Sequence, residues 1–418
     1  MRFLILSDIH FIAAAEEQDP NAKMRRVFLQ DLKDYVSEIG SFDYILISGD
    51  VASKGVKAEF DIAFKLINDI CDIVKCTTDC VYVVPGNHDK NFKSHNPELR
   101  HLINAGLSCE SAEPDEKFTQ LLYKDFKNFK LLYHPFTDYH DFALNFDSAE
   151  PMMQKIIVNP NATNFDHTTD KFYLKSQLKD LNDYHVNLYC LNTSLISDWD
   201  DLKDDGTGHK LFLPSFSYNA IADTEGSINI AMMHHPLTHL VDKAKIETIL
   251  DQSFQLQIYG HLHRSASTAN NAIRIESGAL QPPAEEGCND YFSVYNIVEL
   301  NIMPNNEQFD KLQVTLRVQK YNEKENKFEE NAESSKNYSV DLKKHFNRWK
   351  QKSPTPNSNL PEGITLRQIR VKFLQNKNRK ALIGADFDDK ETMNENSIRF
   401  LNKMEEEGRL TELWNNMK

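Results

Sequence analysis

The chain has 418 residues, which is enough for two or three domains with a buried hydrophobic core. Apolar residues make up 40% of it, a share that favours a globular over a disordered protein. With 62 acidic and 48 basic residues the formal net charge is -14, so the overall field does not attract nucleic acid, which we expect only as a substrate at a local site.

The N-terminal apolar run, residues 3–6, is followed at once by Ser7 and Asp8. Such a run is too short for the apolar region of a signal peptide and far too short to cross a bilayer. We therefore expect a cytoplasmic protein without a membrane partner.

The N-terminal part alternates between predicted strands and helices. We expect strands over residues 2–7, 44–47 and 81–84, and helices over residues 24–39 and 60–74. This order favours parallel strands with crossover helices, and ligands collect at the carboxyl ends of such strands. The polar residues at those ends are Asp8, His10, Asp50, Asn87 and His88.

A long and irregular stretch over about residues 91–185 follows. Such an excursion between core strands is typical of a cap or lid around a site. Its histidines have no ligand-like spacing, so we expect His95, His101, His134 and His140 to be ordinary surface histidines.

The strand pattern then returns. Predicted strands over residues 186–191, 228–233 and 254–259 lead to Asn192-Thr193, His234-His235-Pro236 and Gly260-His261-Leu262-His263. A helix is expected over residues 244–250. Further strands are expected over residues 272–275, 291–300 and 312–320, with a closing hairpin between residues 313–321 and 327–329.

The C-terminal part begins after a stretch rich in Ser, Pro and Asn. We divide the chain into a main domain over residues 1–350, a linker over residues 351–363 and a helical module over residues 364–418. The alternative, C-terminal helices packed on the main domain, stays open.

The strand ends together supply oxygen and nitrogen donors without sulfur, a set that suits a pair of divalent cations such as Mn, Fe or Zn. Two adjacent cations need a shared anion, and we choose Asp50 because it lies between the flanking strands. Each motif alone also fits a polar turn, but five of them after predicted strands favour a metal site. The predicted ligands are Asp8, His10, Asp50, Asn87, His234, His261 and His263.

Two cations about 3.5–4 Å apart lower the pKa of a shared water, whose hydroxide is the nucleophile in a displacement at phosphorus. We assign catalytic roles to His88 and Asp89 beside the metals. His88 is expected to donate a proton to the leaving oxygen or to stabilise its charge, and Asp89 to orient the His88 ring by a hydrogen bond.

The ordered motifs Asp8-x-His10, Gly49-Asp50, Gly86-Asn87-His88-Asp89, His234-x-Pro236 and Gly260-His261-x-His263 resemble the calcineurin-like metallophosphoesterase family over roughly residues 1–300. The resemblance implies an α/β fold, a four-layered α/β/β/α sandwich, to which the cap insertion and the C-terminal helical module are additions. It also implies two divalent metal ions. Asp8, His10, Asp50 and His263 would surround one, and Asp50, Asn87, His234 and His261 the other, with His235 a neighbour.

Within the family, the protein phosphatases carry Gly-Asp-Tyr-Val-Asp-Arg-Gly and Gly-Asn-His-Glu. This chain has Gly49-Asp50-Val51-Ala52-Ser53-Lys54-Gly55 and a terminal Asp89, and it resembles the cyclic-nucleotide phosphodiesterase branch. The resemblance implies a dinuclear metal-dependent phosphodiesterase that hydrolyses a phosphoester, with nucleotides among the candidate substrates. The alternative enzyme is a metal-dependent DNA or RNA nuclease.

The tail, through residues 398–401 and 408–414, resembles the effector-associated adaptor domains of bacterial NTPase-linked defence systems. That resemblance implies a protein partner bound through residues 364–418. The alternative function of another class is therefore an adaptor or scaffold protein that acts through its C-terminal helical module.

Overall fold

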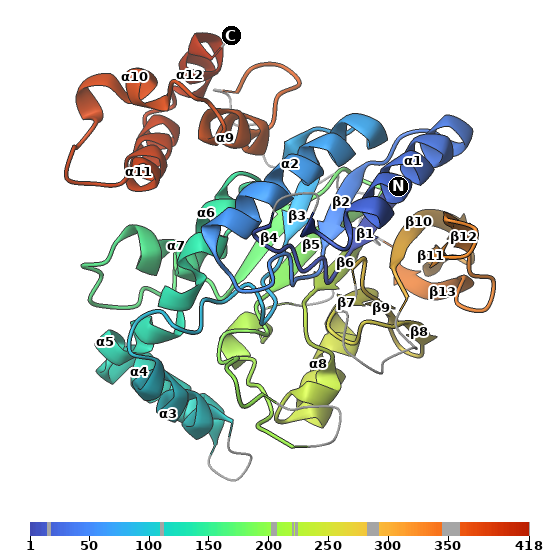
Figure 1. Ribbon diagram of the computed structural model, residues 1–418, viewed down its shortest axis with the longest axis horizontal. Coiled ribbons are helices and arrows are strands. Elements are labelled where there is room, and N and C mark those ends of the chain that lie inside the picture. The colour runs from blue at the N-terminus through green and yellow to red at the C-terminus, as the bar shows by residue number, and fades with distance from the viewer. Residues whose placement is uncertain are drawn as a thin grey trace.

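The computed structural model describes residues 1–14, 18–108, 113–201, 207–219, 221, 225–281, 292–344 and 360–417. Two β-sheets lie face to face at its centre, and helices cover their outer faces (Figure 1). The predicted α/β sandwich is thereby confirmed.

The first sheet has the strand order β12-β11-β10-β1-β2-β3, with β13 paired to β11. Its strands β1, β2 and β3 are parallel, as predicted, and β10 runs antiparallel to β1. Its strands are β1 (Arg2–Leu6), β2 (Tyr44–Ile47), β3 (Val81–Val83), β10 (Val294–Pro304), β11 (Phe309–Asn322), β12 (Lys327–Glu330) and β13 (Lys336–Lys343).

The second sheet has the order β4-β5-β6-β7-β9-β8, in which β5, β6, β7 and β9 are parallel. Strand β4 forms one edge, although it lies within the stretch that we expected to be an insertion. The strands are β4 (Tyr173–Gln177), β5 (His185–Leu191), β6 (Ser227–Met232), β7 (Leu256–Tyr259), β8 (Ser265–Ala269) and β9 (Ile273–Ser277).

The alternation of side chains along β1 explains the layers. Phe3 and Ile5 point into the core between the two sheets. Leu4 and Leu6 point the other way, into the core that contains Phe28 of helix α1. Strand β1 is apolar on both faces because both of its faces are covered. The helices of this part are α1 (Ala22–Ile39), α2 (Lys57–Val74) and, beyond β6, α8 (Lys243–Ser253).

The inserted region is mostly helical and packs through aromatic rings. Phe118 alone contacts the rings of Phe129, Phe172 and Phe212. His140 is fully buried, so its prediction as a surface histidine is wrong. The helices are α3 (Pro97–Leu107), α4 (Pro114–Lys124), α5 (Phe126–Phe129), α6 (Thr137–Leu144) and α7 (Pro151–Val158).

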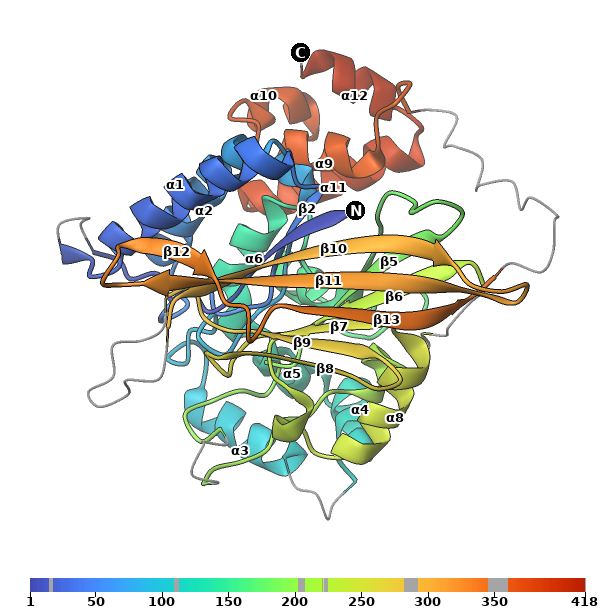
Figure 2. The same ribbon diagram turned by 90° about the vertical axis from the view of Figure 1, so that its right-hand side faces the viewer.

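The C-terminal helices lie beside α2 and α6 in both views (Figures 1 and 2). Arg367 donates hydrogen bonds to the carbonyls of Asp79, Val81, Phe146 and Asp147. Of the predicted linker over residues 351–363, residues 351–359 lie outside the described residues. The helices are α9 (Leu366–Leu374), α10 (Arg379–Ile383), α11 (Met393–Glu406) and α12 (Leu410–Asn416).

Several short elements complete the chain. Strands β8 and β13 escaped the sequence prediction because both are mostly polar, with few buried positions. Among the helices of the described residues, none has the length and apolar character needed to cross a membrane. The short 3₁₀ turns are Thr78–Cys80, Lys130–Leu132, His134–Phe136, Ser215–Ser217, Leu237–His239 and Gly384–Asp386.

Candidate metal centre

The predicted ligands follow the carboxyl ends of parallel strands from both sheets. Asp8, Asp50 and Asn87 follow β1, β2 and β3, while His234 and His261 follow β6 and β7. A hydrogen bond joins the ligands of the first sheet to those of the second: the backbone N–H of His261 donates to Asp8 Oδ2 at 3.0 Å. The sandwich therefore brings motifs far apart in sequence to one edge.

Asp8, His10 and His263 form what we call the first donor group. His263 Nε2 lies 3.3 Å from Asp8 Oδ1 and 3.3 Å from His10 Nε2, and the distance from His10 Nε2 to Asp8 Oδ1 is 3.8 Å. Asp8 is fully buried, and its Oδ1 has no hydrogen-bond partner among the described residues. A buried carboxylate oxygen without a donor is costly, and a cation between these three atoms would satisfy it.

Asp50, Asn87 and His234 form the second donor group. His234 Nε2 lies 3.2 Å from Asp50 Oδ2 and 3.1 Å from Asn87 Oδ1. The other ring nitrogen, Nδ1, lies 2.8 Å from the carbonyl of Ser48 and donates to it. This bond fixes the ring and directs Nε2 at the two oxygens, as is usual for a metal-binding histidine.

Asp50 connects the two groups. Its carboxylate shares one set of mutually close ligand atoms with Asp8 and His234, and another with His10 and His88. His261 lies in a further set with His234 and His235. The structure thus brings the predicted ligands together in one cluster, and it adds the ring nitrogens of His88 and His235.

The backbone at the ligands is left-handed at five positions. The φ angles of Asp8, His10, Asp50, His261 and His263 lie between 48° and 71°. This conformation is uncommon for residues other than glycine and costs about 1–3 kcal/mol each, so it persists where the fold holds it for a functional reason.

Two glycines of the motifs provide the room that the cluster needs. A Cβ at Gly86 would lie 2.0 Å from Asp50 Oδ1, and a Cβ at Gly49 would lie 2.5 Å from His234 Nδ1. Gly49 also has a φ of 100°, which favours glycine. Both glycines are therefore explained by the close approach of ligand side chains.

Electrostatics sets the charges of the cluster. Burial alone would raise the pKa of Asp50, but the facing His234 and His88 lower that pKa well below its usual value. Burial opposes the charge on His234, yet the Asp50 carboxylate raises the pKa of His234 to about 9. Burial lowers the pKa of His10 to about 4 and that of His261 to about 3, so both rings stay neutral, the form that binds cations.

Asp89 has a different role from the one predicted. Its Oδ1 accepts a hydrogen bond from the backbone of Ala52 at 2.8 Å and its Oδ2 accepts one from Gly86 at 2.9 Å. His88 Nδ1 instead lies 3.0 Å from the carbonyl of Ser53. The prediction that Asp89 orients the His88 ring is wrong, because the carboxylate is used to join the loops after β2 and β3.

Lys90 holds the loop after β3 against the loop after β5. Its side chain is buried, and Nζ donates to the carbonyls of Ser194, Leu195 and Ser197 at 2.6–3.1 Å. Burial lowers the pKa of Lys90 to about 7. Ser194 Oγ adds a bond to the carbonyl of Pro85 at 3.0 Å. Sequence reasoning missed Lys90, since a lysine after a turn is typical of the surface.

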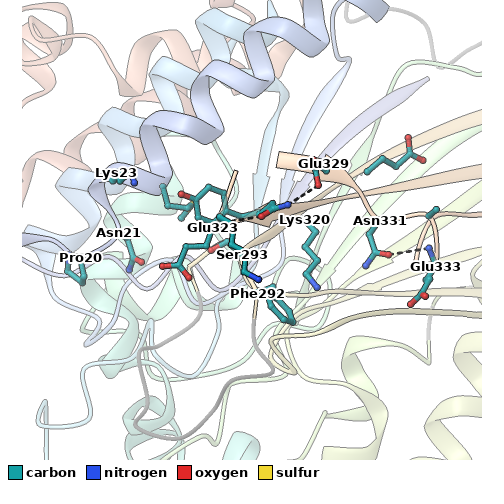
Figure 3. A pocket seen from close by; sticks show the side chains of 16 residues that line it. Pro20, Asn21, Lys23, Phe292, Ser293, Lys320, Glu323, Glu329, Asn331 and Glu333 are labelled. Atoms are coloured by element: carbon teal, nitrogen blue, oxygen red, sulfur yellow. Dashed lines mark hydrogen bonds between the residues drawn. The ribbon is translucent and has the colours of Figure 1, made fainter. Parts of the chain in front are cut away.

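A large cleft of the described residues lies away from the donor groups. It has a volume of about 950 Å³ and is lined by the start of α1 and by β11 and β12, with no predicted ligand in its wall. Figure 3 shows Lys320 beside Phe292, and the Lys320 Nζ lies 3.3 Å from the centre of that ring. Its wall carries lysines and glutamates but none of the predicted ligands, so we place the candidate site at the donor groups instead.

The donor set fits divalent cations. It combines two carboxylates, one amide oxygen and imidazole nitrogens at one buried edge, a mixture that suits first-row metals. The unpartnered Oδ1 of Asp8 and the shared carboxylate of Asp50 point to two adjacent positions. Both donor groups could therefore hold a cation without rearrangement of the fold.

The region that carries the donor groups is similar to known proteins. A family model described as "Calcineurin-like phosphoesterase" matches residues 1–265. The uncharacterized metallophosphoesterase-like protein YydB of Bacillus subtilis (strain 168) is 24% identical over 293 residues, which are 67% of this chain and 53% of that protein. The chain thus spans about half the length of this curated relative.

Solved structures with a similar arrangement include wild-type Vps29 of Entamoeba histolytica complexed with zinc, at a TM-score of 0.31 and 10% identity over 82% of this chain and 99% of that one. Purple acid phosphatase PPD1 from yellow lupin (Lupinus luteus) seeds gives a TM-score of 0.38 and 11% identity over 83% and 54%. Because the family model covers more than half of the residues, the chain belongs to the calcineurin-like phosphoesterase family.

Proposed function

We propose that the protein is a dinuclear metal-dependent phosphodiesterase. The observation that carries the proposal is the position of Asp50, whose carboxylate lies within reach of ligand atoms from both donor groups. Two divalent cations bound there would lower the pKa of a bound water and offset the charge that develops at phosphorus. In this assignment Asp8, His10, Asp50 and His263 hold one cation, and Asp50, Asn87, His234 and His261 hold the other.

His88 is proposed as the residue that meets the leaving group. It is the exposed member of the cluster, and its ring lies 4.7 Å from the ring of His10. Because Nδ1 donates to the Ser53 carbonyl, Nε2 is free to face an oxygen of the substrate. A protonated Nε2 would donate to the leaving oxygen, which is ordinary general acid catalysis. Asp89 is a positioning residue, because its carboxylate holds the loop that carries His88 through the backbone N–H groups of Ala52 and Gly86.

The proposal of a diester substrate, with nucleotides as the first class to test, rests on Asp89, which joins the loops after β2 and β3. Asp89 fits between the backbone N–H groups of Ala52 and Gly86 and is fully buried. A glutamate, as in the protein phosphatases of this family, would have to place one more methylene there. This supports a branch other than the protein phosphatases.

A substrate panel tests the proposal. The chain loaded with Mn²⁺ should hydrolyse an aryl phosphodiester and cyclic nucleotides faster than the matching aryl phosphomonoester. Duplex DNA, single-stranded DNA and RNA belong in the same panel, and cleavage of these polymers above all others would favour the nuclease alternative. Preference for the monoester would overturn the diesterase assignment while leaving the metal centre in place.

The adaptor alternative makes a different prediction. A protein partner for residues 364–418 stays a proposal, and it predicts binding that survives loss of the metals. If the wild-type chain binds two cations but hydrolyses no ester of the panel, the phosphodiesterase proposal fails.

A further inference from the structure

A cavity of about 220 Å³ lies between the loop after β6 and the strands β7, β8 and β9. Two of its walls continue directly from the loops that carry predicted ligands. Residues 236–238 come just after His234, and residues 266–268 begin three residues after His263. Strands β8 and β9 lie side by side at one edge of the second sheet (Figure 2). The cavity is smaller than the roughly 300–1,000 Å³ of sites that enclose a drug-sized ligand, so it has room for one planar ring system rather than for a whole nucleotide.

Glu276 of β9 lines this cavity close to the metal centre. Alternate residues of β9 are buried between the two sheets, so Arg274 and Glu276 point to the opposite face. Tyr259, the last residue of β7, pairs with Glu276 in the parallel register, and His261 follows two residues later. Neighbouring strands are about 4.8 Å apart and two residues span at most about 7 Å, so the Cα atoms of Glu276 and His261 lie within about 12 Å of each other. This separation suits a nucleotide whose phosphate is held at the metal centre.

The carboxylate of Glu276 is half-buried and lacks a donor. Within the described part of the chain no side chain donates a hydrogen bond to it, and burial raises the pKa of Glu276 against the opposing effect of Arg264. Arg274 on the same strand is already bound to Glu247 and Asp251 of α8. Ala266 pairs with Glu276 across β8 and β9, and its small side chain leaves room beside the carboxylate. A half-buried carboxylate of this kind calls for a donor from a ligand.

The charges around Glu276 decide which kind of donor fits. Lys243 and Arg274 line the cavity, and Arg264 is close enough to act on the charge of Glu276. These three cations disfavour a positively charged ligand group, so a neutral group with N–H donors is the better partner. A carboxylate accepts two hydrogen bonds side by side through its two oxygens. Guanine is the common base whose Watson–Crick edge carries two adjacent N–H donors, whereas adenine has one amino group beside an acceptor nitrogen.

We propose that this cavity binds the base of a guanine nucleotide whose phosphate lies at the metal centre. Glu276 accepts hydrogen bonds from N1–H and from the 2-amino group of the base, and it is thereby a specificity-determining residue. The buried Tyr259 and the backbone of residues 236–238 form the walls on either side of the ring. This inference rests on the proposed function, because it specifies which nucleotide the phosphodiesterase takes.

Isothermal titration calorimetry of the Mn²⁺-loaded chain with 5′-GMP, 5′-IMP and 5′-AMP tests the proposal. IMP keeps N1–H but lacks the 2-amino group. GMP should bind at least about 10-fold more tightly than AMP, with IMP between them, because hydrogen bonds to a charged acceptor are the stronger kind. Glu276→Gln should lower the affinity for GMP about 10-fold and remove the preference over AMP. Glu307→Gln, at an exposed position in the turn between β10 and β11, is the matched control and should change none of the three affinities.

The wild-type chain alone can overturn the proposal, since equal affinities for GMP and AMP, or no binding of GMP at millimolar concentration, would refute it without any variant. A folded Glu276→Gln variant that keeps the preference for GMP would also refute it. Binding is measured independently of hydrolysis. A chain that prefers GMP but hydrolyses no diester therefore refutes the proposed function alone, and a chain that hydrolyses diesters but binds the three nucleotides equally refutes the base pocket alone.

Discussion

The metal centre and the C-terminal helices are held in place by opposite means. In the metal centre, the backbone is left-handed at five ligand positions, and carboxylates and imidazoles are crowded together. Asp8 Oδ1 has no hydrogen-bond donor among the described residues. At the C-terminal helices, the Arg367 guanidinium donates hydrogen bonds to four backbone carbonyls. Its Cζ lies 4.0 Å from the centre of the Tyr82 ring. The first region is arranged for a ligand at some cost in stability, whereas the second contributes stability directly.

The largest expected effect is a loss of catalytic rate that leaves the stability of the fold unchanged. His88→Ala should lower kcat about 10³-fold, because a general acid contributes roughly 10²–10⁴-fold. Metal content and melting temperature should stay near the wild-type values, since His88 is exposed and is not one of the proposed ligands. Steady-state kinetics on an aryl diester measures the effect. His185→Ala, which removes an exposed histidine paired with Asp180, is the control and should be neutral.

The second effect is a loss of stability that leaves the metal centre unchanged. Arg367→Ala removes the bonds to four carbonyls and should lower the free energy of unfolding by about 3 kcal/mol, as expected for charged hydrogen bonds in a partly buried site. Urea denaturation measures this loss, and bound metal per chain should not change. Arg399→Ala breaks an exposed pair with Glu391 and should cost less than about 1 kcal/mol. Equal losses in the two variants would show that Arg367 is not an anchor.

The smallest effect is a pH dependence at the base of the inserted region. Burial raises the pKa of Glu150 to about 7, and Glu150 accepts a hydrogen bond from Tyr133 at 2.7 Å. A carboxyl whose folded pKa is above its unfolded value favours the protonated form in the folded chain. Its contribution to stability therefore falls as the pH rises from about 4.5 to about 7.

Glu150→Gln should remove this dependence. The variant should gain about 2 kcal/mol relative to the wild type between pH 5 and pH 8, in urea denaturation at each pH. Glu98→Gln, on the exposed face of α3, is the control and should give parallel curves. A wild-type curve that runs parallel to that of Glu150→Gln would contradict the assignment.

The sequence predicted the architecture well wherever the pattern was local. The strand over residues 44–47 is apolar and ends in a Gly-Asp turn, so both the strand and the position of Asp50 could be read from neighbouring residues. The same holds for the parallel order of β1, β2 and β3. These features depend on short-range periodicity, which one chain displays without an alignment.

The partners of charged side chains could not be predicted in this way. Lys90, Asp89 and Arg367 are charged residues in or beside turns and amphipathic helices, where solvent exposure is the usual outcome. Their hydrogen-bond partners are carbonyl and N–H groups that are far away in sequence. The burial of His235 was likewise hidden, because it depends on contacts with Thr193 and Ser194, which lie more than 40 residues away along the chain.

The central claim is that Asp50 joins two cation positions, and a count of bound metal tests it most directly. The wild-type chain, loaded with Mn²⁺ or Zn²⁺ and freed of excess by gel filtration, should hold two metal ions per chain by inductively coupled plasma mass spectrometry. Asp50→Ala should hold at most one, with the circular dichroism spectrum of the wild type. Two ions per chain in a folded Asp50→Ala variant would contradict the account.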